Sequence, residues 1–242
     1  MVFVIDIGNT KIKTAVFEAD KLVVRTDFEY ENWQKNILKK IDSFSKIETV
    51  IVASVAKFDE NDFLFLSKFK LIFITNNTKL PFHNLYTTPN TLGIDRKVLA
   101  AGAVLKYQNI NRLIIDAGTC VTYDFVDSNN SYFGGAISPG LRIRYKSLHD
   151  YTAKLPLLEA QMPEHFIGNA TSESIHAGVI YGLLHEIDGF IDHYRAIYEN
   201  FIIILTGGDT EFLAKQLKNI IFANENFLLE SLNLIYQYQE HD

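Results

Sequence analysis

The sequence predicts a duplicated α/β fold, with two similar domains that each hold a mixed β-sheet flanked by helices, and with a cleft between them. The first observation is a pair of similar motifs, Asp6-Ile7-Gly8-Asn9-Thr10 and Asp116-Ala117-Gly118-Thr119, which both follow a short apolar run. The second is the order of elements, because three strands joined by tight turns precede alternating helices and strands in each half. The predicted domains are therefore residues 1–108 and 109–242.

The first half alternates apolar, β-branched runs with amphipathic stretches, which predicts strands and helices in turn. Mostly polar residues with Pro81 and Pro89 predict a loop over 75–91. The predicted strands are 2–7, 12–18, 21–28, 49–53 and 71–74, and the predicted helices are 31–43, 59–68 and 94–107.

The second half repeats this pattern, with a helix predicted after the third strand and a late apolar strand followed by a helix to about residue 219. The apolar run Phe227-Leu228-Leu229 predicts a last short strand before a terminal helix at 230–239. The other predicted strands are 112–116, 119–126, 131–137 and 202–205.

The longest predicted helix covers 171–199 and carries an apolar residue at every fourth position from Ile175 to Ile191. Gly178 and Gly182 lie near this face, and glycine inside a helix costs about 1 kcal/mol relative to alanine. Close approach of a second helix would offset this cost. Packing within one subunit and a dimer interface both explain the two glycines.

Composition excludes several classes of protein. Of the 242 residues, 48% are hydrophobic, which excludes a disordered chain, and no run is long enough to span a membrane. The net charge of −6 without a basic run argues against a nucleic-acid partner. Cys120 is the only cysteine, so no internal disulfide can form, and without a signal peptide we expect a cytoplasmic protein.

The two Asp-x-Gly motifs are candidates for phosphate binding. A glycine turn lets backbone N–H groups approach a phosphate, and the following threonine adds a hydroxyl donor. The aspartate before each turn can hold a cation or a bridging water. Asp-x-Gly is also common in hairpins for conformational reasons alone, but two copies favour a nucleoside triphosphate gripped from both sides.

Gly93-Ile94-Asp95-Arg96 stands where a helix is predicted to begin, so Asp95 is a candidate general base beside an anion-binding helix start. The structural alternative is an N-terminal helix acid beside a basic neighbour. Two further glycine turns, Gly134–Gly140 and Thr206-Gly207-Gly208-Asp209, fit a nucleotide or acceptor pocket, although such turns also occur without ligands.

Together these motifs resemble those of the type III pantothenate kinases, and the resemblance covers essentially the whole chain. In this order and spacing they are jointly specific, although the family often has alanine where Cys120 stands. The motifs that carry it are Asp6-x-Gly8-Asn9-Thr10, Gly93-x-Asp95-Arg96, Asp116-x-Gly118-Thr119 with Thr122 and Asp124, Gly134-Gly135 to Gly140, Thr152-Ala153-x-Leu155-Pro156, Gly168-Asn169-x-Thr171 and Thr206-Gly207-Gly208.

The resemblance implies ATP-dependent phosphorylation of pantothenate to 4'-phosphopantothenate, the first step towards coenzyme A. It also implies the ribonuclease H-like, actin-like ATPase fold that acetate and sugar kinases and heat-shock 70 proteins share. The implied ligands are ATP with Mg²⁺, pantothenate and a monovalent cation, K⁺ or NH₄⁺, and the implied assembly is a homodimer.

Carried over by motif, the resemblance makes Asp95 the catalytic proton acceptor and Asp116 the ligand of the monovalent cation. Arg96 either holds an end of pantothenate or steadies Asp95. Thr171 reaches pantothenate from the partner subunit. The implied ATP-binding residues are Asp6, Ile7, Gly8, Asn9, Thr10, Lys11, Ile12, Lys13 and Thr119, and the implied substrate-binding residues are Tyr86, Gly93, Ile94, Asp95, Arg96 and Thr171.

Three alternatives stand beside this prediction. The chain could be a non-catalytic accessory member of the same family, or a different kinase or phosphatase on the same fold, such as a sugar kinase or exopolyphosphatase. An actin-like or chaperone-like nucleotide switch needs extra subdomains that 242 residues hardly accommodate.

Overall fold

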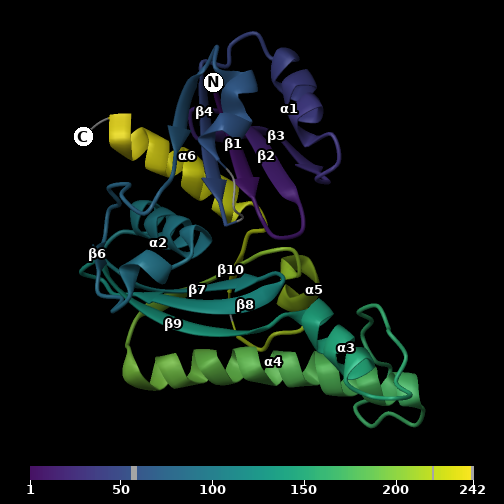
Figure 1. Cartoon of the computed structure of the whole chain (residues 1–242). Coiled ribbons are helices and arrows are strands. Elements are labelled where there is room, and N and C mark those ends of the chain that lie inside the picture. Colours follow the sequence, from purple (N-terminus) through teal and green to yellow (C-terminus); the bar gives the residue numbers. More distant parts are fainter. Residues whose placement is uncertain (56–58, 220, 241–242) are drawn as a thin grey trace. The chain divides into compact units, whose positions relative to one another are not determined.

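The computed structural model describes residues 1–55, 59–219 and 221–240, and the chain divides into two compact units (Figure 1). Unit 1 contains Met1–Gln108, Asn130–Tyr132 and Asn226–Asp242, and unit 2 contains Asn109–Asn129 and Phe133–Glu225. The sequence predicts a single domain over 109–242, whereas the structure groups the chain's last helix with unit 1. No described helix is both long and apolar enough to cross a membrane.

Unit 1 is built on a five-stranded sheet in the order β3-β2-β1-β4-β5. Strand β1 pairs antiparallel with β2, to which a hairpin turn joins it, and parallel with β4, which the chain reaches by a crossover connection. Strand β1 is therefore the central strand of the sheet. All six residues of β1 are buried, as expected of a central strand that is covered on both faces. The strands are β1 (Val2–Ile7), β2 (Ile12–Glu18), β3 (Lys21–Phe28), β4 (Thr49–Ser54) and β5 (Lys70–Phe73).

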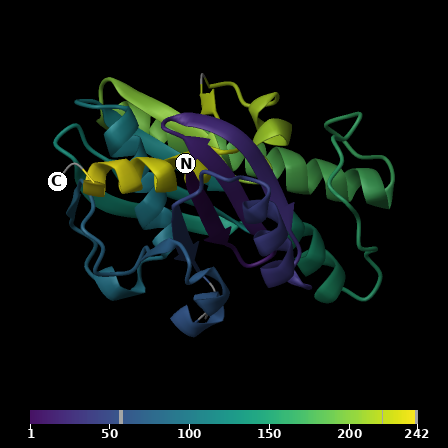
Figure 2. The same ribbon diagram turned by 90° about the horizontal axis from the view of Figure 1, so that it is seen from above.

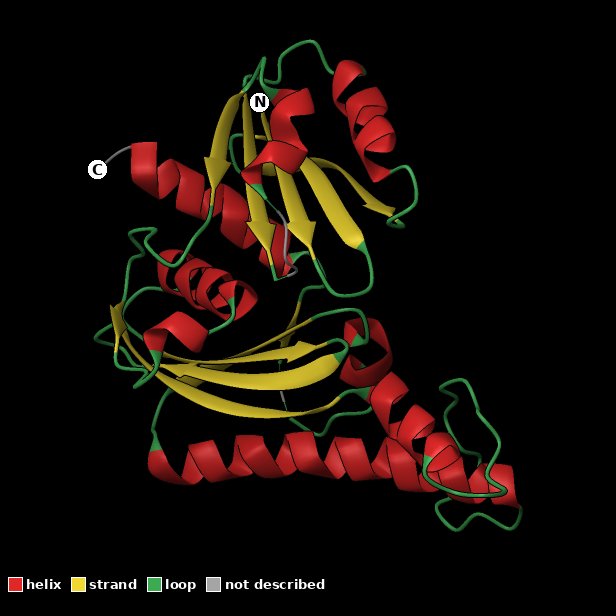
Figure 3. Ribbon diagram, viewed as in Figure 1, coloured by secondary structure: helices red, strands yellow, loops and turns green. Residues whose placement is uncertain are grey.

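Helices cover both faces of this sheet (Figure 3). Helix α1 (Trp33–Asp42) and the 3₁₀-helix η1 (Glu60–Leu66) join one core, in which Ile37 and Phe63 pack against β1 and β4. Helices α2 (Ile94–Lys106) and α6 (Phe227–Glu240) pack against each other and against the strands.

The close packing of α2 and α6 explains why the terminal helix belongs to unit 1. A Cβ on Gly102 would lie 1.9 Å from Ser231 Oγ, so the two helices touch at backbone distance. The strand predicted at Phe227-Leu228-Leu229 is wrong, because these three buried residues form the first turn of α6. A short apolar run does not distinguish a strand from a buried helical turn.

Unit 2 repeats the strand order of unit 1, as β9-β8-β7-β10-β11. This repetition confirms the predicted duplication. The two-residue strands β6 (His83–Asn84) and β11 were not predicted, and β6 pairs with Ser131 and Tyr132 at the start of β9, which belong to unit 1. The strands are β7 (Asn111–Ala117), β8 (Cys120–Val126), β9 (Ser131–Pro139), β10 (Phe201–Thr206) and β11 (Phe222–Ala223).

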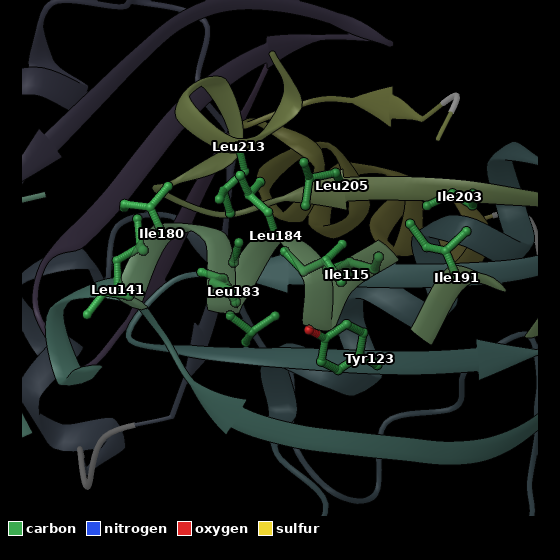
Figure 4. Packing of buried hydrophobic residues seen from close by; sticks show 14 of the residues in the cluster. Ile115, Tyr123, Leu141, Ile180, Leu183, Leu184, Ile191, Ile203, Leu205 and Leu213 are labelled. Carbon is green, nitrogen blue, oxygen red and sulfur yellow. The ribbon is translucent and has the colours of Figure 1, made fainter. Parts of the chain in front are cut away.

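Helix α4 (Thr171–Ile197) runs along one face of this sheet and supplies much of the core of unit 2. Figure 4 shows Ile180, Leu183, Leu184 and Ile191 of α4 packed towards strand residues such as Ile115. Helix α5 (Thr210–Ala214) is shorter than predicted, and α3 (Leu141–Asp150) packs on α4. The segment between α3 and α4 is a long loop beside the N-terminal end of α4 (Figures 1 and 2).

Candidate functional site

The first glycine turn joins β1 to β2 in unit 1. The Gly8 N–H donates to Lys11 O at 3.1 Å, which closes the turn, and the Tyr30 hydroxyl donates to Gly8 O. Asn9 and Thr10 are exposed at the tip. Ile7 and Ile12 pair across the hairpin with fully buried side chains, so at these two predicted ATP-binding positions only the backbone can meet a ligand.

Four charged residues stand in or beside this turn, as the pairs Asp6 and Lys13 and Lys11 and Glu29. Asp6 is 4% exposed and stands opposite Lys13 in the β1–β2 register. Burial and the negative charge of Asp6 raise the pKa of Tyr30. Lys11 is exposed and pairs with Glu29 at 3.2 Å, an arrangement that leaves its side chain open to a competing phosphate.

The second glycine turn joins β7 to β8 in unit 2 and is closed by Gly118 N–H donating to Cys120 O at 3.0 Å. Gly140, which precedes α3, donates its N–H to Thr119 O at 3.1 Å. Asp209, at the start of α5, donates its N–H to Ala117 O at 3.0 Å. Three glycine motifs that are distant in the sequence therefore converge on one turn.

Two of these glycines leave no room for a side chain. A Cβ on Gly140 would lie 2.1 Å from Gly118 O, and one on Gly207 would lie 2.3 Å from Ala117 O and 2.5 Å from the Asp116 carboxylate. Gly207 also has φ +99°, a conformation that side chains disfavour. The glycines therefore allow the three loops to pack against each other at backbone distance.

Two acidic residues of unit 2, Asp116 and Asp209, stand at the same loops. The Asp116 carboxylate faces the Gly207 backbone, and burial raises the pKa of Asp209. No cluster of three or more His, Cys, Asp or Glu side chains suited to a metal occurs among the residues that the structure describes.

In unit 1, Asp95 lies in the first turn of α2. Its Oδ1 accepts a hydrogen bond from Arg96 N–H at 2.8 Å, and a Cβ on the N-cap residue Gly93 would lie 2.3 Å from the same oxygen. The helix dipole favours the ionised form of a carboxylate at this position. The absence of a side chain at Gly93 therefore gives the Asp95 carboxylate its place at the helix start.

Arg96 and Tyr86 come together although nine residues lie between them in the sequence. The Arg96 guanidinium, 5% exposed, lies 5.7 Å from the centre of the Tyr86 ring, a cation–π arrangement. Tyr86 also lies 6.3 Å from the buried ring of Tyr132. The structure thus brings Tyr86 to Arg96, and Ile94, Asp95 and Arg96 are the first three residues of α2 after the N-cap Gly93.

Thr171 lies apart from the second turn, at the first position of α4. It lines a cavity of about 870 Å³ in unit 2 together with Arg144, Leu155, Asn169 and Ser174. Asp116 and Thr119 are not among the residues that line this cavity. Both polar donors and apolar walls face its interior, as in many sites for small organic molecules.

Sequence reasoning missed a polar network around Glu186 of α4. The Glu186 carboxylate accepts hydrogen bonds from the Tyr123 hydroxyl at 2.9 Å, from Ser138 Oγ and from Arg144 Nη2. Arg144 Nε also donates to Pro139 O at 2.8 Å. The network therefore ties α4 to the turn that ends at Gly140, and its only sequence signal is a charged residue beside the apolar stripe of α4.

The charge state of Glu186 follows from these contacts. Burial alone would raise the pKa of this carboxyl, but the hydrogen bonds from Ser138, Arg144 and Tyr123 outweigh it and hold the pKa below its ordinary value. Burial, and then the hydrogen bond to Glu186, raise the pKa of Tyr123 well above its usual range. Glu186 is therefore ionised and Tyr123 protonated at neutral pH.

The chain resembles one family along most of its length. The model of the type III pantothenate kinases matches residues 2–193. The type III pantothenate kinase of Flavobacterium johnsoniae is 55% identical over 240 residues, which cover 99% of this chain and 98% of that protein. The type III pantothenate kinase of Phocaeicola vulgatus is 38% identical over 242 residues, 99% of each chain.

Solved structures share the fold at low sequence identity. The activator of the 2-hydroxyisocaproyl-CoA dehydratase from Clostridium difficile, with bound ADPNP, has a TM-score of 0.56 and 13% identity over 100% of this chain and 97% of that one. The inorganic polyphosphate/ATP-glucomannokinase from Arthrobacter has a TM-score of 0.50 and 14% identity over 100% and 99%. The predicted actin-like, ribonuclease H-like fold is confirmed.

Proposed function

The chain belongs to the type III pantothenate kinase family and phosphorylates pantothenate with ATP, and we propose that Asp95 and the two glycine turns carry out this reaction. The product is 4'-phosphopantothenate, and the reaction is the first step of coenzyme A synthesis. The arrangement of Asp95 beside Gly93 at the start of α2 is the observation that carries the assignment of the catalytic residue.

ATP binds, in this proposal, through the backbone of both turns. The exposed tip from Gly8 to Thr10 and the side chains of Lys11 and Lys13 supply N–H, hydroxyl and ammonium donors, and Thr119 supplies a hydroxyl from the second turn. Donors of this kind stabilise the charge of a transferring phosphoryl group, which is the main task of a kinase site. Mg²⁺ bound to the phosphates would neutralise further charge.

Asp95 accepts the proton of the pantothenate hydroxyl as its oxygen attacks the γ-phosphorus. The dipole of α2 favours a negative charge at this position, and the hydrogen bond from Arg96 N–H orients the carboxylate at the helix start. Arg96 and Tyr86 bind the rest of pantothenate. Their cation–π contact fixes both side chains before the substrate arrives, which lowers the ordering cost of binding.

Asp116 holds a monovalent cation, K⁺ or NH₄⁺, beside the second turn. The residues fit such an ion, because the Asp116 carboxylate and the backbone carbonyl groups of the converging loops are oxygen ligands, which hard cations prefer. The cation would offset phosphate charge near Thr119.

A homodimer is the proposed assembly, with Thr171 of each subunit reaching the pantothenate of the other. Gly178 and Gly182 support it, because a Cβ on either would meet nothing within 4 Å, so this face of α4 is open in the single chain. Phe166 and Ile167 beside it are 66% and 81% exposed, and a second copy would cover them. We place the enzyme in the cytoplasm, in keeping with its single free cysteine.

A coupled assay of ADP release tests this function. We expect ADP formation that requires both ATP and pantothenate, that is faster in potassium than in sodium, and that the Asp95→Asn variant loses. A chain that binds ATP but forms no ADP with pantothenate would be an accessory member of the family. ADP release with a sugar and not with pantothenate would indicate another kinase on this fold.

A further inference from the structure

Lys97 is a buried lysine that the proposed chemistry does not use. It follows Arg96 on α2, is 4% exposed, and is succeeded by the buried residues Val98 and Leu99. Burial lowers the pKa of its ammonium group. Within residues 1–55, 59–219 and 221–240, its side chain has a neutral partner, the Asn76 amide, and no carboxylate forms an ion pair with it. An ammonium that is desolvated without an ion pair is costly, so its retention calls for a reason.

The contact of Lys97 reaches the start of the long loop before α2. Lys97 Nζ donates to Asn76 Oδ1 at 2.7 Å. A turn fixes the position of Asn76, because Thr75 N–H donates to Thr78 Oγ1 at 2.8 Å and Thr78 N–H donates to Thr75 O at 3.2 Å. The ammonium group is therefore bonded to the side chain of a residue that stands within a hydrogen-bonded turn.

The same Asn76 side chain also reaches the other end of the loop. Its Nδ2 donates to the carbonyl oxygen of Asn90 at 3.4 Å, and Asn90 lies in the short 3₁₀-helix η2 (Pro89–Thr91) just before α2. We call residues 76–90 the substrate loop. Lys97 and Asn76 thus join both ends of the substrate loop to the first turns of α2.

The substrate loop carries Tyr86, and backbone hydrogen bonds of His83 and Leu85 to Asn130 and Tyr132 also hold its middle. The Tyr86 ring lies over Arg96, the residue next to Lys97, and the two-residue strand β6 pairs with Ser131 and Tyr132. Two consecutive residues of α2 therefore fasten one loop, Arg96 at its middle and Lys97 at its ends.

We propose that Lys97 is a positioning residue, which holds the substrate loop against the first turn of α2 in the conformation that binds pantothenate. The inference rests on the proposed role of Tyr86 and Arg96 in binding that substrate. A loop released from this tether occupies the binding conformation for only part of the time, which weakens apparent affinity in proportion. Saturating pantothenate restores the conformation, so the effect falls on KM and not on kcat.

The first test is the Lys97→Met variant, which keeps the length of the side chain and removes its charge. We expect KM for pantothenate to rise about tenfold, the effect of one lost hydrogen bond to a charged group. The kcat value and KM for ATP should stay within about twofold of the wild type. The melting temperature should hold or rise, because an apolar side chain replaces a buried charge.

Two substitutions at Asn76 separate positioning from general stability. Asn76→Leu removes the hydrogen-bond acceptor of Lys97 and leaves the buried ammonium group without that partner. We therefore expect the same rise in pantothenate KM, with a lowered melting temperature. Asn76→Asp keeps an acceptor for Lys97 but loses the Nδ2 donor to Asn90 O, so we expect a smaller rise in pantothenate KM than in Asn76→Leu. The matched control is Lys106→Met, which removes the same charge from the same helix, where Lys106 pairs with Glu230 on α6.

Hydrogen–deuterium exchange of residues 76–90 gives a readout without substrate. Exchange should be faster in Lys97→Met and in Asn76→Leu than in the wild type or Lys106→Met. Unchanged exchange and unchanged pantothenate KM in Lys97→Met would overturn the inference, as would a KM that follows the melting temperature across the variants. If the wild type failed to phosphorylate pantothenate, the proposed function would be wrong. The exchange data would still show whether Lys97 and Asn76 hold the substrate loop.

Discussion

Gly140 and Gly118 lie in direct backbone contact, because a Cβ on Gly140 would lie 2.1 Å from the carbonyl oxygen of Gly118. The residue that precedes α3 therefore supports the proposed second phosphate turn. The adjoining bond from Gly140 N–H to Thr119 O, at 3.1 Å, fixes the position of the threonine proposed to bind ATP.

Gly140→Ala should displace this turn. The added methyl group cannot be accommodated against two carbonyl oxygens, so we expect a loss of about 1–3 kcal/mol in the free energy of unfolding. We also expect a higher KM for ATP with little change for pantothenate, measured by denaturant titration and steady-state kinetics. Gly189→Ala on α4 is the control, since a Cβ there meets nothing within 4 Å. An unchanged ATP KM in a folded Gly140→Ala protein would contradict the support role.

Asp95→Asn should abolish most of the turnover and spare ATP binding. The amide cannot accept the hydroxyl proton, and general-base catalysis contributes about 10²–10⁴-fold in rate. Rates of ADP release and calorimetric titration with ATP measure the two effects separately. Asp42→Asn, at a surface carboxylate that pairs with Lys68, serves as the control for charge loss. A variant that retains wild-type turnover would remove Asp95 from the role of base.

The proposed cation site predicts an ion-specific rate. Potassium should support ADP release and sodium should not, because the larger ion suits a site of one carboxylate and several neutral oxygens. The Asp116→Asn variant should lose this dependence along with most of its activity. Rates that are equal in the two salts, at matched ionic strength, would contradict a specific monovalent site.

Mixed subunits test the shared active site. Neither Asp95→Asn nor Thr171→Ala protein should be active alone, but a mixed dimer would contain one site in which both residues are intact. We therefore expect activity to return after subunit exchange, with the dimer confirmed by sedimentation. Confirmed exchange without recovered activity would show that each site lies within one subunit.

Glu186 predicts how stability depends on pH. Its pKa is lower in the folded protein than its ordinary value of 4.5, so its contribution is present above that value and is lost as the pH falls through the folded pKa. We expect Glu186→Gln to flatten this acid limb of the stability curve. Denaturant titrations between pH 3 and 7 measure it, about the span over which such a carboxyl titrates. An unchanged acid limb would mean that other carboxyls determine it.

Hydrophobic pattern was sufficient to predict most elements of the fold. The five strands of the first sheet, the four longer strands of the second (β7, β8, β9 and β10) and the 27-residue helix α4 follow from local periodicity alone. The short run Phe227-Leu228-Leu229 was misread because its partner is α2, which is far away in the sequence. Local pattern also cannot reveal that the segment 226–240 completes the first unit.

The candidate site likewise contains residues that local sequence pattern predicts and residues that it does not. Glycine turns are visible in the sequence because their conformation restricts residue type, and the structure brings three of them together around Gly118. Lys97 and Glu186 were missed because their importance depends on burial and on distant partners, Asn76 and Arg144. The roles assigned to the predicted residues in binding and catalysis stay predictions.

The position of α6 bears on how the protein is made. The ribosome synthesises residues 109–225 before α6, the helix that completes unit 1. Unit 2 can therefore fold while unit 1 still lacks α6. Until then α2 exposes the face that Ser231 later covers. Unit 1, which is synthesised first, is thus the last to finish folding. Its incomplete nascent form is the one that needs protection by chaperones.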